Sequence, residues 1–171
     1  MFDMQRPKIK VSRDTTDKVI ETLTVLSLVF SFGFIGFHYS ELPDLVPAHF
    51  GLDGKVNRYD EKSMIWFLPL LLSVICFGIY ILNKQPYLYN YAIKITSENA
   101  EKQYRSSTKM MRYINLSLAL ICAVITYEMV TIALSNSTNF SPFSNYFLIL
   151  ILAFLTITPI VLVIKNLFQQ Q

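Results

Sequence analysis

The sequence predicts an all-α, polytopic membrane protein: a bundle of four transmembrane helices with an ordered outer loop. Of the 171 residues, 53% are hydrophobic and 16% are charged, whereas a soluble domain has roughly 25% charged residues. The apolar residues form four blocks, each close to the roughly 20 residues that a helix needs to cross a bilayer. The blocks are continuous, unlike the alternating strands of a membrane barrel. We therefore expect one membrane domain over residues 1–171.

The four helices are expected over residues 19–39, 63–82, 113–134 and 143–164. The first is free of charged residues from Thr22 to Phe37, and the third carries one charge, Glu128. The second and fourth carry none. Basic residues precede the first helix, as in a signal peptide, but residues 37–40 offer no small-x-small cleavage site. We therefore expect the first helix to remain as a membrane anchor.

Lys and Arg are unevenly divided between the two sides of this predicted bundle. Twelve lie in the N-terminal tail, the 83–112 loop and the C-terminal end, and three lie in the 40–62 loop. Because basic residues gather on the cytoplasmic side, we expect both termini and the 83–112 loop in the cytoplasm and the 40–62 loop outside. This topology, with anionic lipid headgroups, accounts for the net charge of +3. The lipid bilayer is therefore an expected partner, and nucleic acid is not.

The outer loop, residues 40–62, is the most distinctive segment. Pro43 and Pro47 prevent a regular helix there, and Gly51 and Gly54 permit tight turns. Charged residues are mixed with apolar ones that a solvated linker would not need, namely Leu42, Leu45, Val46 and Phe50. We expect a compact loop packed on the outer ends of the helices. It is either a functional element or an ordered connector without a ligand.

The loop also carries a set of residues at fixed spacing. The set is Leu42-Pro43-Asp44, Pro47, His49-Phe50, Gly54 and Lys62, followed by Leu68-Pro69 in the next helix. It resembles the signature of the domain-of-unknown-function 1648 family, with Asn57 at a position where that family usually has Asp. The stretch from Asn83 to Arg105 is similar to the inner loop of four-helix members.

The resemblance implies a bacterial inner-membrane protein. The family is similar to the N-terminal part of the immunity proteins that protect bacteria from the sporulation-delaying toxin. Those proteins also act as signal receptors that hold a repressor at the membrane when the toxin is present. By this resemblance, a peptide toxin or a lipid is the expected ligand at the outer leaflet. A cytosolic regulator is the expected partner at the basic inner loop, residues 83–112.

Glu128 is the one charged residue inside the third predicted span. It lies six residues before Leu134, so about 9 Å below the outer end of its helix. A carboxylate in hydrocarbon is unfavourable by several kcal/mol unless it is paired, protonated or facing a wet cavity. The predicted topology brings five polar residues to the outer surface: Glu128, His38, His49, Asp44 and Lys62.

This group of residues has two non-metal interpretations. It is a structural knot if His49 and Asp44 hydrogen-bond the loop to itself and Glu128 pairs with Lys62 or Tyr127. It is a recognition pocket for a peptide or lipid if the loop and the helix ends leave a partly polar cleft. Removing His49 should distinguish the two, because only the second needs that side chain for a phenotype.

A third interpretation is a divalent-metal site, for example for zinc, built from His38, His49, Asp44 and Glu128. Imidazoles and carboxylates are suitable zinc ligands, although no HExxH-like register fixes these residues together. Such a site would make the protein a membrane-embedded metal-dependent enzyme. The remaining alternative is a structural accessory subunit of a membrane complex. We favour a non-enzymatic protein with no cofactor and no catalytic residue.

The inner loop begins with Tyr87, Tyr89 and Tyr91. From Ser97 onward, a capping serine followed by Glu98 and Glu101 predicts a helix start. We expect that helix to run continuously into the third membrane helix. The loop is either an interfacial segment with aromatic and basic anchors or a docking surface for a cytosolic regulator.

Single cysteines test the predicted orientation. In a protein whose Cys76 and Cys122 are replaced by alanine, Asp53→Cys should react with a membrane-impermeant maleimide in intact cells, because it lies outside. Lys94→Cys should react only after the membrane is permeabilised. Labelling of position 94 with protection of position 53 would invert the topology.

Overall fold

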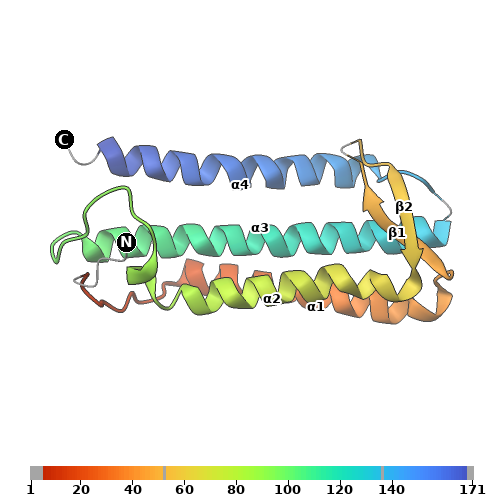
Figure 1. Cartoon of the computed structure of the whole chain (residues 1–171), viewed down its shortest axis with the longest axis horizontal. Helices are drawn as coiled ribbons and strands as arrows, with labels where there is room; N and C mark the ends of the chain where they lie inside the picture. The colour runs from red at the N-terminus through yellow and green to blue at the C-terminus, as the bar shows by residue number, and fades with distance from the viewer. Residues whose placement is uncertain (1–5, 52, 136, 169–171) are drawn as a thin grey trace.

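The computed structural model describes residues 6–51, 53–135 and 137–168 (Figure 1). Within them, four helices are long and apolar enough to cross a membrane. They are α1 (Thr15–His38), α2 (Phe67–Leu82) together with the 3₁₀ turn that begins at Lys62, α3 (Ala100–Ser135) and α4 (Pro142–Phe168). The mostly helical, four-span prediction is confirmed, with one addition. The expected outer loop contains a two-stranded hairpin of β1 (Leu45–Phe50) and β2 (Val56–Glu61).

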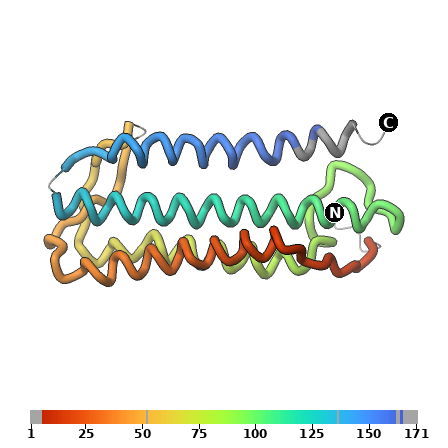
Figure 2. The backbone as a smooth tube through the Cα atoms, turned by 180° about the vertical axis from the view of Figure 1, so that it is seen from behind, coloured from red at the N-terminus to blue at the C-terminus, as the bar shows by residue number. Residues whose placement is uncertain are grey.

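The helices lie side by side, with α3 in the centre (Figures 1 and 2). Helices α1 and α2 pack on one side of α3, α4 packs on the other, and α1 and α2 make few contacts with each other. Half of the most apolar stretch of α3 is buried, against 11% in α4. The outer helices therefore present large apolar side chains to their surroundings, as lipid contact allows.

The two ends of the bundle differ. One end, which we term the hairpin end, carries β1 and β2 (Figure 1). The opposite end, which we term the N-terminal end, carries residues 6–14, the 83–99 segment and the last turns of α4 (Figure 2). Short 3₁₀ turns lead into and out of these segments, at Tyr39–Glu41, Lys62–Trp66 and Pro86–Leu88.

Helix α1 begins at Thr15, four residues earlier than expected, because Asp14 caps it. The Asp14 carboxylate accepts from Asp17 N (2.8 Å), and the Asp17 carboxylate accepts from Asp14 N (3.1 Å). This reciprocal pair is a capping box, which satisfies two otherwise free donors of the first turn. The bond from Asp17 N, followed by that from Lys109, lowers the pKa of Asp14.

Helix α3 runs without a break through 36 residues. The helix predicted to start at Ser97 therefore continues into the membrane helix, as expected, although regular helix begins three residues later, at Ala100. Asn99 precedes this start, and its side-chain oxygen accepts from Thr96 N (2.9 Å).

The N-terminal end has its own small core. Ile95, Ala100 and Tyr104 are buried there, and Ile9 and Val11 of the N-terminal segment pack against them. Burial raises the pKa of Tyr91 to about 12, so its hydroxyl stays protonated and donates to Pro86 O (2.9 Å). The N-terminal segment is thus an ordered part of this end.

A buried ion pair joins α1 to α3 at the same end. Arg112 Nε donates to Glu21 Oε1 (2.8 Å), and Arg112 Nη1 lies 3.5 Å from Asp17 Oδ1. The Arg112 side chain is 8% exposed and that of Asp17 is 4% exposed. Arg13 also contacts Glu21 (3.0 Å), but its side chain is 51% exposed. The sequence analysis placed Arg112 among the loop bases and missed this network, because its acids lie 91 and 95 residues away.

Arg112→Ala should lower the free energy of unfolding by about 3–5 kcal/mol, because it leaves a buried carboxylate without its partner. Thermal unfolding in detergent, followed by circular dichroism, measures the loss. Arg13→Ala is the matched control and should change stability far less, since its pair with Glu21 is solvent-exposed. Equal losses in the two variants would contradict the role assigned to burial.

Candidate ligand-binding site at the hairpin end

Hydrogen bonds connect the hairpin to the segment that leads into α4. Its turn contains Gly54 at φ 77°, where a side chain would be strained and an added Cβ would lie 2.6 Å from Asn145 Oδ1. Gly54 O accepts from Phe140 N (2.9 Å), and Val56 N donates to Thr138 O (2.9 Å). The connector between α3 and α4 therefore pairs with the hairpin turn.

An apolar core lies beneath the hairpin. It consists of six buried residues from α1, the hairpin, the segments on either side of the hairpin, and α3: Ile35, Leu42, Val46, Ile65, Met129 and Val130. Pro47 is also buried, and the Phe50 and Phe140 rings pack with centroids 4.4 Å apart. The apolar residues that a solvated loop would not need thus hold β1 against the helix ends.

Glu128 is 2% exposed and binds the start of α4. Ser141 Oγ donates to Glu128 Oε1 (2.7 Å), and Ser141 N donates to Oε2 (3.2 Å). Ser141 immediately precedes α4, and its hydroxyl accepts from Ser144 N (3.2 Å), as a helix-capping serine does. The expected partners Lys62 and Tyr127 are therefore wrong. The sequence does contain a local signal for a helix start at this point, because Ser141 is a capping residue and Pro142 is a proline in the first turn. This signal could have indicated that Ser141 is the partner of Glu128.

Lys62 instead closes the base of the hairpin. Its Nζ donates to Leu42 O (2.9 Å) and lies 4.7 Å from the centre of the Tyr39 ring. Its backbone N donates to Asp44 O (2.8 Å), whereas the Asp44 side chain is on the exposed surface together with Pro43. Lys62 is thus a structural clamp between the two ends of the loop.

The two histidines have separate local partners. His49 Nδ1 lies 2.6 Å from Asn57 Oδ1 across the two strands, and His38 Nδ1 lies 3.1 Å from Glu41 Oε2. Asn57, where the resembled signature usually has Asp, gives His49 a neutral partner. Taken over the residues that the structure describes, no group of three or more His, Cys, Asp or Glu side chains is placed to hold a metal ion. The candidates His38, His49, Asp44 and Glu128 are therefore not gathered into one site.

The hairpin exposes both apolar and charged groups. Leu45 and Tyr59 are large exposed residues, 58% and 45% exposed, and Arg58 pairs with Asp60 (3.0 Å). In the turn, the backbone N–H of Lys55 lowers the pKa of Asp53, so this carboxylate stays ionised. The surface is amphipathic and lies beside the membrane-spanning helices.

One edge of β2 is open. β2 pairs with β1 along one side, and the connector covers its other side only at Lys55 and Val56. Residues 57–61 have no second strand neighbour in the described parts of the chain. An open strand edge can accept an extended peptide as a further strand. The sequence analysis missed the hairpin, although Asp53-Gly54 is a recognised hairpin-turn pair.

Comparison with known proteins agrees with the loop signature. Residues 26–72, from α1 through the hairpin into α2, match the family model described as "Domain of unknown function (DUF1648)", which confirms the resemblance over these residues. An "Uncharacterized protein" of the archaeon Archaeoglobus fulgidus is 29% identical over 69 residues, which cover 40% of this chain and 38% of the relative. The matched part thus spans less than half of that relative. No solved structure matches the chain.

Glu128→Leu should destabilise the protein by about 1.5–3 kcal/mol, because it removes the hydrogen bonds to the buried carboxyl and leaves the half-buried Ser141 donors without their acceptor. Hydrogen exchange should also become faster at the Ser141 and Ser144 amides. Glu41→Leu, which removes an exposed carboxylate at the same end, is the control and should leave both amides unchanged. Unaltered exchange in Glu128→Leu would show that Glu128 does not hold the start of α4.

Proposed function

We propose that the chain is a non-enzymatic, multi-pass protein of the bacterial inner membrane with both termini in the cytoplasm. Its hairpin binds an amphipathic peptide at the outer leaflet, the task implied by the resemblance to toxin-immunity and signalling proteins. The observation that carries this proposal is the open β2 edge, residues 57–61, beside exposed Leu45 and Tyr59. Backbone pairing with such an edge supplies affinity, and the neighbouring side chains supply selectivity.

The distribution of charge supports the orientation. Lys55, Arg58 and Lys62 belong to the hairpin end, whereas the N-terminal segment and the 83–112 region carry most of the remaining bases. Basic residues favour the cytoplasmic side of a membrane. The start of α1 and the end of α4 lie at the same end of the bundle (Figure 1), as an even number of crossings requires.

The contacts also connect the hairpin to α4, so a movement of the hairpin would be transmitted to that helix. The hairpin turn hydrogen-bonds Thr138 and Phe140, and Ser141, which directly follows Phe140, is held by Glu128. Helix α4 packs on α3 and is otherwise largely exposed. A peptide that shifts the hairpin would therefore act first on the anchored start of α4. At the far end, exposed Lys102 lies on the surface assigned to a cytosolic regulator.

A labelled synthetic amphipathic peptide tests the proposal on protein reconstituted in nanodiscs. The double variant Leu45→Ser/Tyr59→Ser should bind it about tenfold more weakly or worse, because two partly exposed apolar contacts are lost. Tyr146→Ser removes an exposed aromatic from α4 and should bind as the wild type does. A photo-crosslinker at position 59 should capture the peptide, and one at position 146 should not.

The same variants separate the alternatives. Equal binding by wild type, the double variant and empty nanodiscs would refute a peptide site on the hairpin. Capture of lipid in place of peptide at position 59 would assign the surface to the bilayer. Protection of cells against the peptide by the wild type, lost in the double variant at equal expression, would support the immunity role.

A further inference from the structure

A large groove separates α1 from α2 near the N-terminal end. It has a volume of about 900 Å³, within the range of ligand pockets. Its walls are mostly apolar and include Val25, Leu26 and Phe77, which are each more than half exposed. The groove therefore opens toward the surroundings of the bundle, which are lipid when the helices cross a membrane.

The groove has the length of one leaflet. On α1 its lining runs from Lys18 to Leu28, ten residues or about 15 Å of helix. The hydrocarbon core of a bilayer is about 30 Å thick, so the groove covers about half of it. Its polar mouth lies at the N-terminal end, where Arg13 and Lys18 belong to the lining.

A basic pocket of about 590 Å³ adjoins that mouth. Lys8, Lys10 and Lys84 line it, and none of them has a carboxylate within ion-pair distance in the described residues. Lys8 and Lys84 instead lie over the rings of Tyr87 (5.5 Å) and Tyr80 (4.5 Å). These ammonium groups are held in place and remain free to bind an anion.

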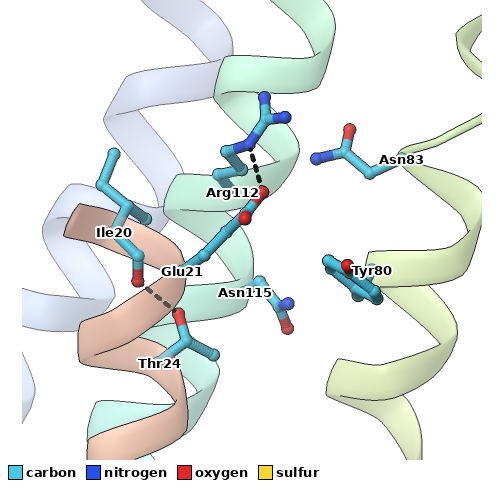
Figure 3. Close-up of a pocket in the computed structure, with 7 residues that line it drawn as sticks. All are labelled: Ile20, Glu21, Thr24, Tyr80, Asn83, Arg112 and Asn115. Carbon is cyan, nitrogen blue, oxygen red and sulfur yellow. Dashed lines mark hydrogen bonds and ion pairs between the residues drawn. The ribbon is translucent and has the colours of Figure 1, made fainter. Parts of the chain in front are cut away.

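Shared residues join the groove to the pocket. Arg13, Glu21 and Tyr80 line both, and Figure 3 shows Glu21 and Tyr80 facing a small polar cavity between them. Glu21 is bound by both Arg13 and Arg112, so its negative charge is already matched and does not oppose an anion. The basic pocket and the apolar groove thus form one continuous surface, which is basic in the pocket and apolar in the groove.

The floor of the groove carries a further polar group. Asn115 Nδ2 donates to Cys76 O (3.1 Å), but the buried Asn115 Oδ1 has no donor in the described residues. Asn115 lines both the groove and the small cavity (Figure 3). The floor of the groove is therefore not wholly apolar, although this oxygen is itself buried.

We propose that this surface binds one anionic phospholipid of the adjacent leaflet. An acyl chain lies between α1 and α2, and the phosphate lies among Lys8, Lys10 and Lys84. The occupant follows from charge complementarity, because a lysine near a membrane surface favours anionic over neutral headgroups by about fivefold. The site is at the opposite end from the hairpin and does not depend on the proposed peptide binding.

Native mass spectrometry of protein exchanged into mixed micelles tests this proposal. The probes are phosphatidylglycerol and phosphatidylcholine with identical acyl chains. The wild type should retain one phosphatidylglycerol in preference to phosphatidylcholine by about fivefold or more. Lys8→Gln/Lys10→Gln/Lys84→Gln should lose that preference. Lys55→Gln/Arg58→Gln, which removes bases at the hairpin end, is the control and should keep it.

The groove itself is tested by a second matched pair. Val25→Trp fills the groove and should reduce retention of both lipids, whereas Val74→Trp, on an exposed part of α2 outside the lining, should not. No lipid preference in the wild type would overturn the proposal. So would equal loss in the lysine variant and its hairpin-end control, or displacement of the bound lipid by glycerol phosphate as effectively as by phosphatidylglycerol.

Discussion

Helix α3 buries an ionisable side chain near each end of its membrane-spanning part, and satisfying both inside an apolar bundle determines how the other helices are attached. Arg112 and Glu128 are 16 residues apart, or about 24 Å along the helix, close to the thickness of a hydrocarbon core. Arg112 is matched by Asp17 and Glu21 of α1. Glu128 is matched by the capping Ser141 of α4. Because an unpaired charge is so unfavourable there, α1 and α4 are each tied to α3 at one end.

The hairpin extends this arrangement across the bundle. Val46 and Leu42 anchor it over the ends of α1 and α3, and its Gly54 turn reaches the connector that leads into α4. One short element therefore contacts both sides of α3 while leaving the residue 57–61 edge open. A rigid support with an unpaired edge is the combination that peptide recognition by strand addition requires.

The hairpin end and the N-terminal end of the bundle differ in the chemical groups that they expose. At the hairpin end, both histidines and Glu128 are bound to nearby partners, as in His49–Asn57 and Glu128–Ser141, and the exposed surface is amphipathic. At the N-terminal end, lysines such as Lys8 and Lys84 rest on tyrosine rings beside an apolar groove. The proposed peptide site and the proposed lipid site thus lie at opposite ends of the bundle.

The sequence by itself determined the helical class and the approximate spans, because long apolar blocks without charge are a local property of the chain. It also contained two local signals from which no prediction was made: the Asp53-Gly54 pair, which is typical of a hairpin turn, and the Ser141-Pro142 pair, which is typical of a helix start. Only the tertiary structure decided which partner satisfies Glu128 and Arg112. Arg112 and Glu21 are 91 residues apart, and their meeting depends on how each helix is rotated about its axis and packed on α3. Hydropathy does not specify that rotation, whereas the packed bundle does.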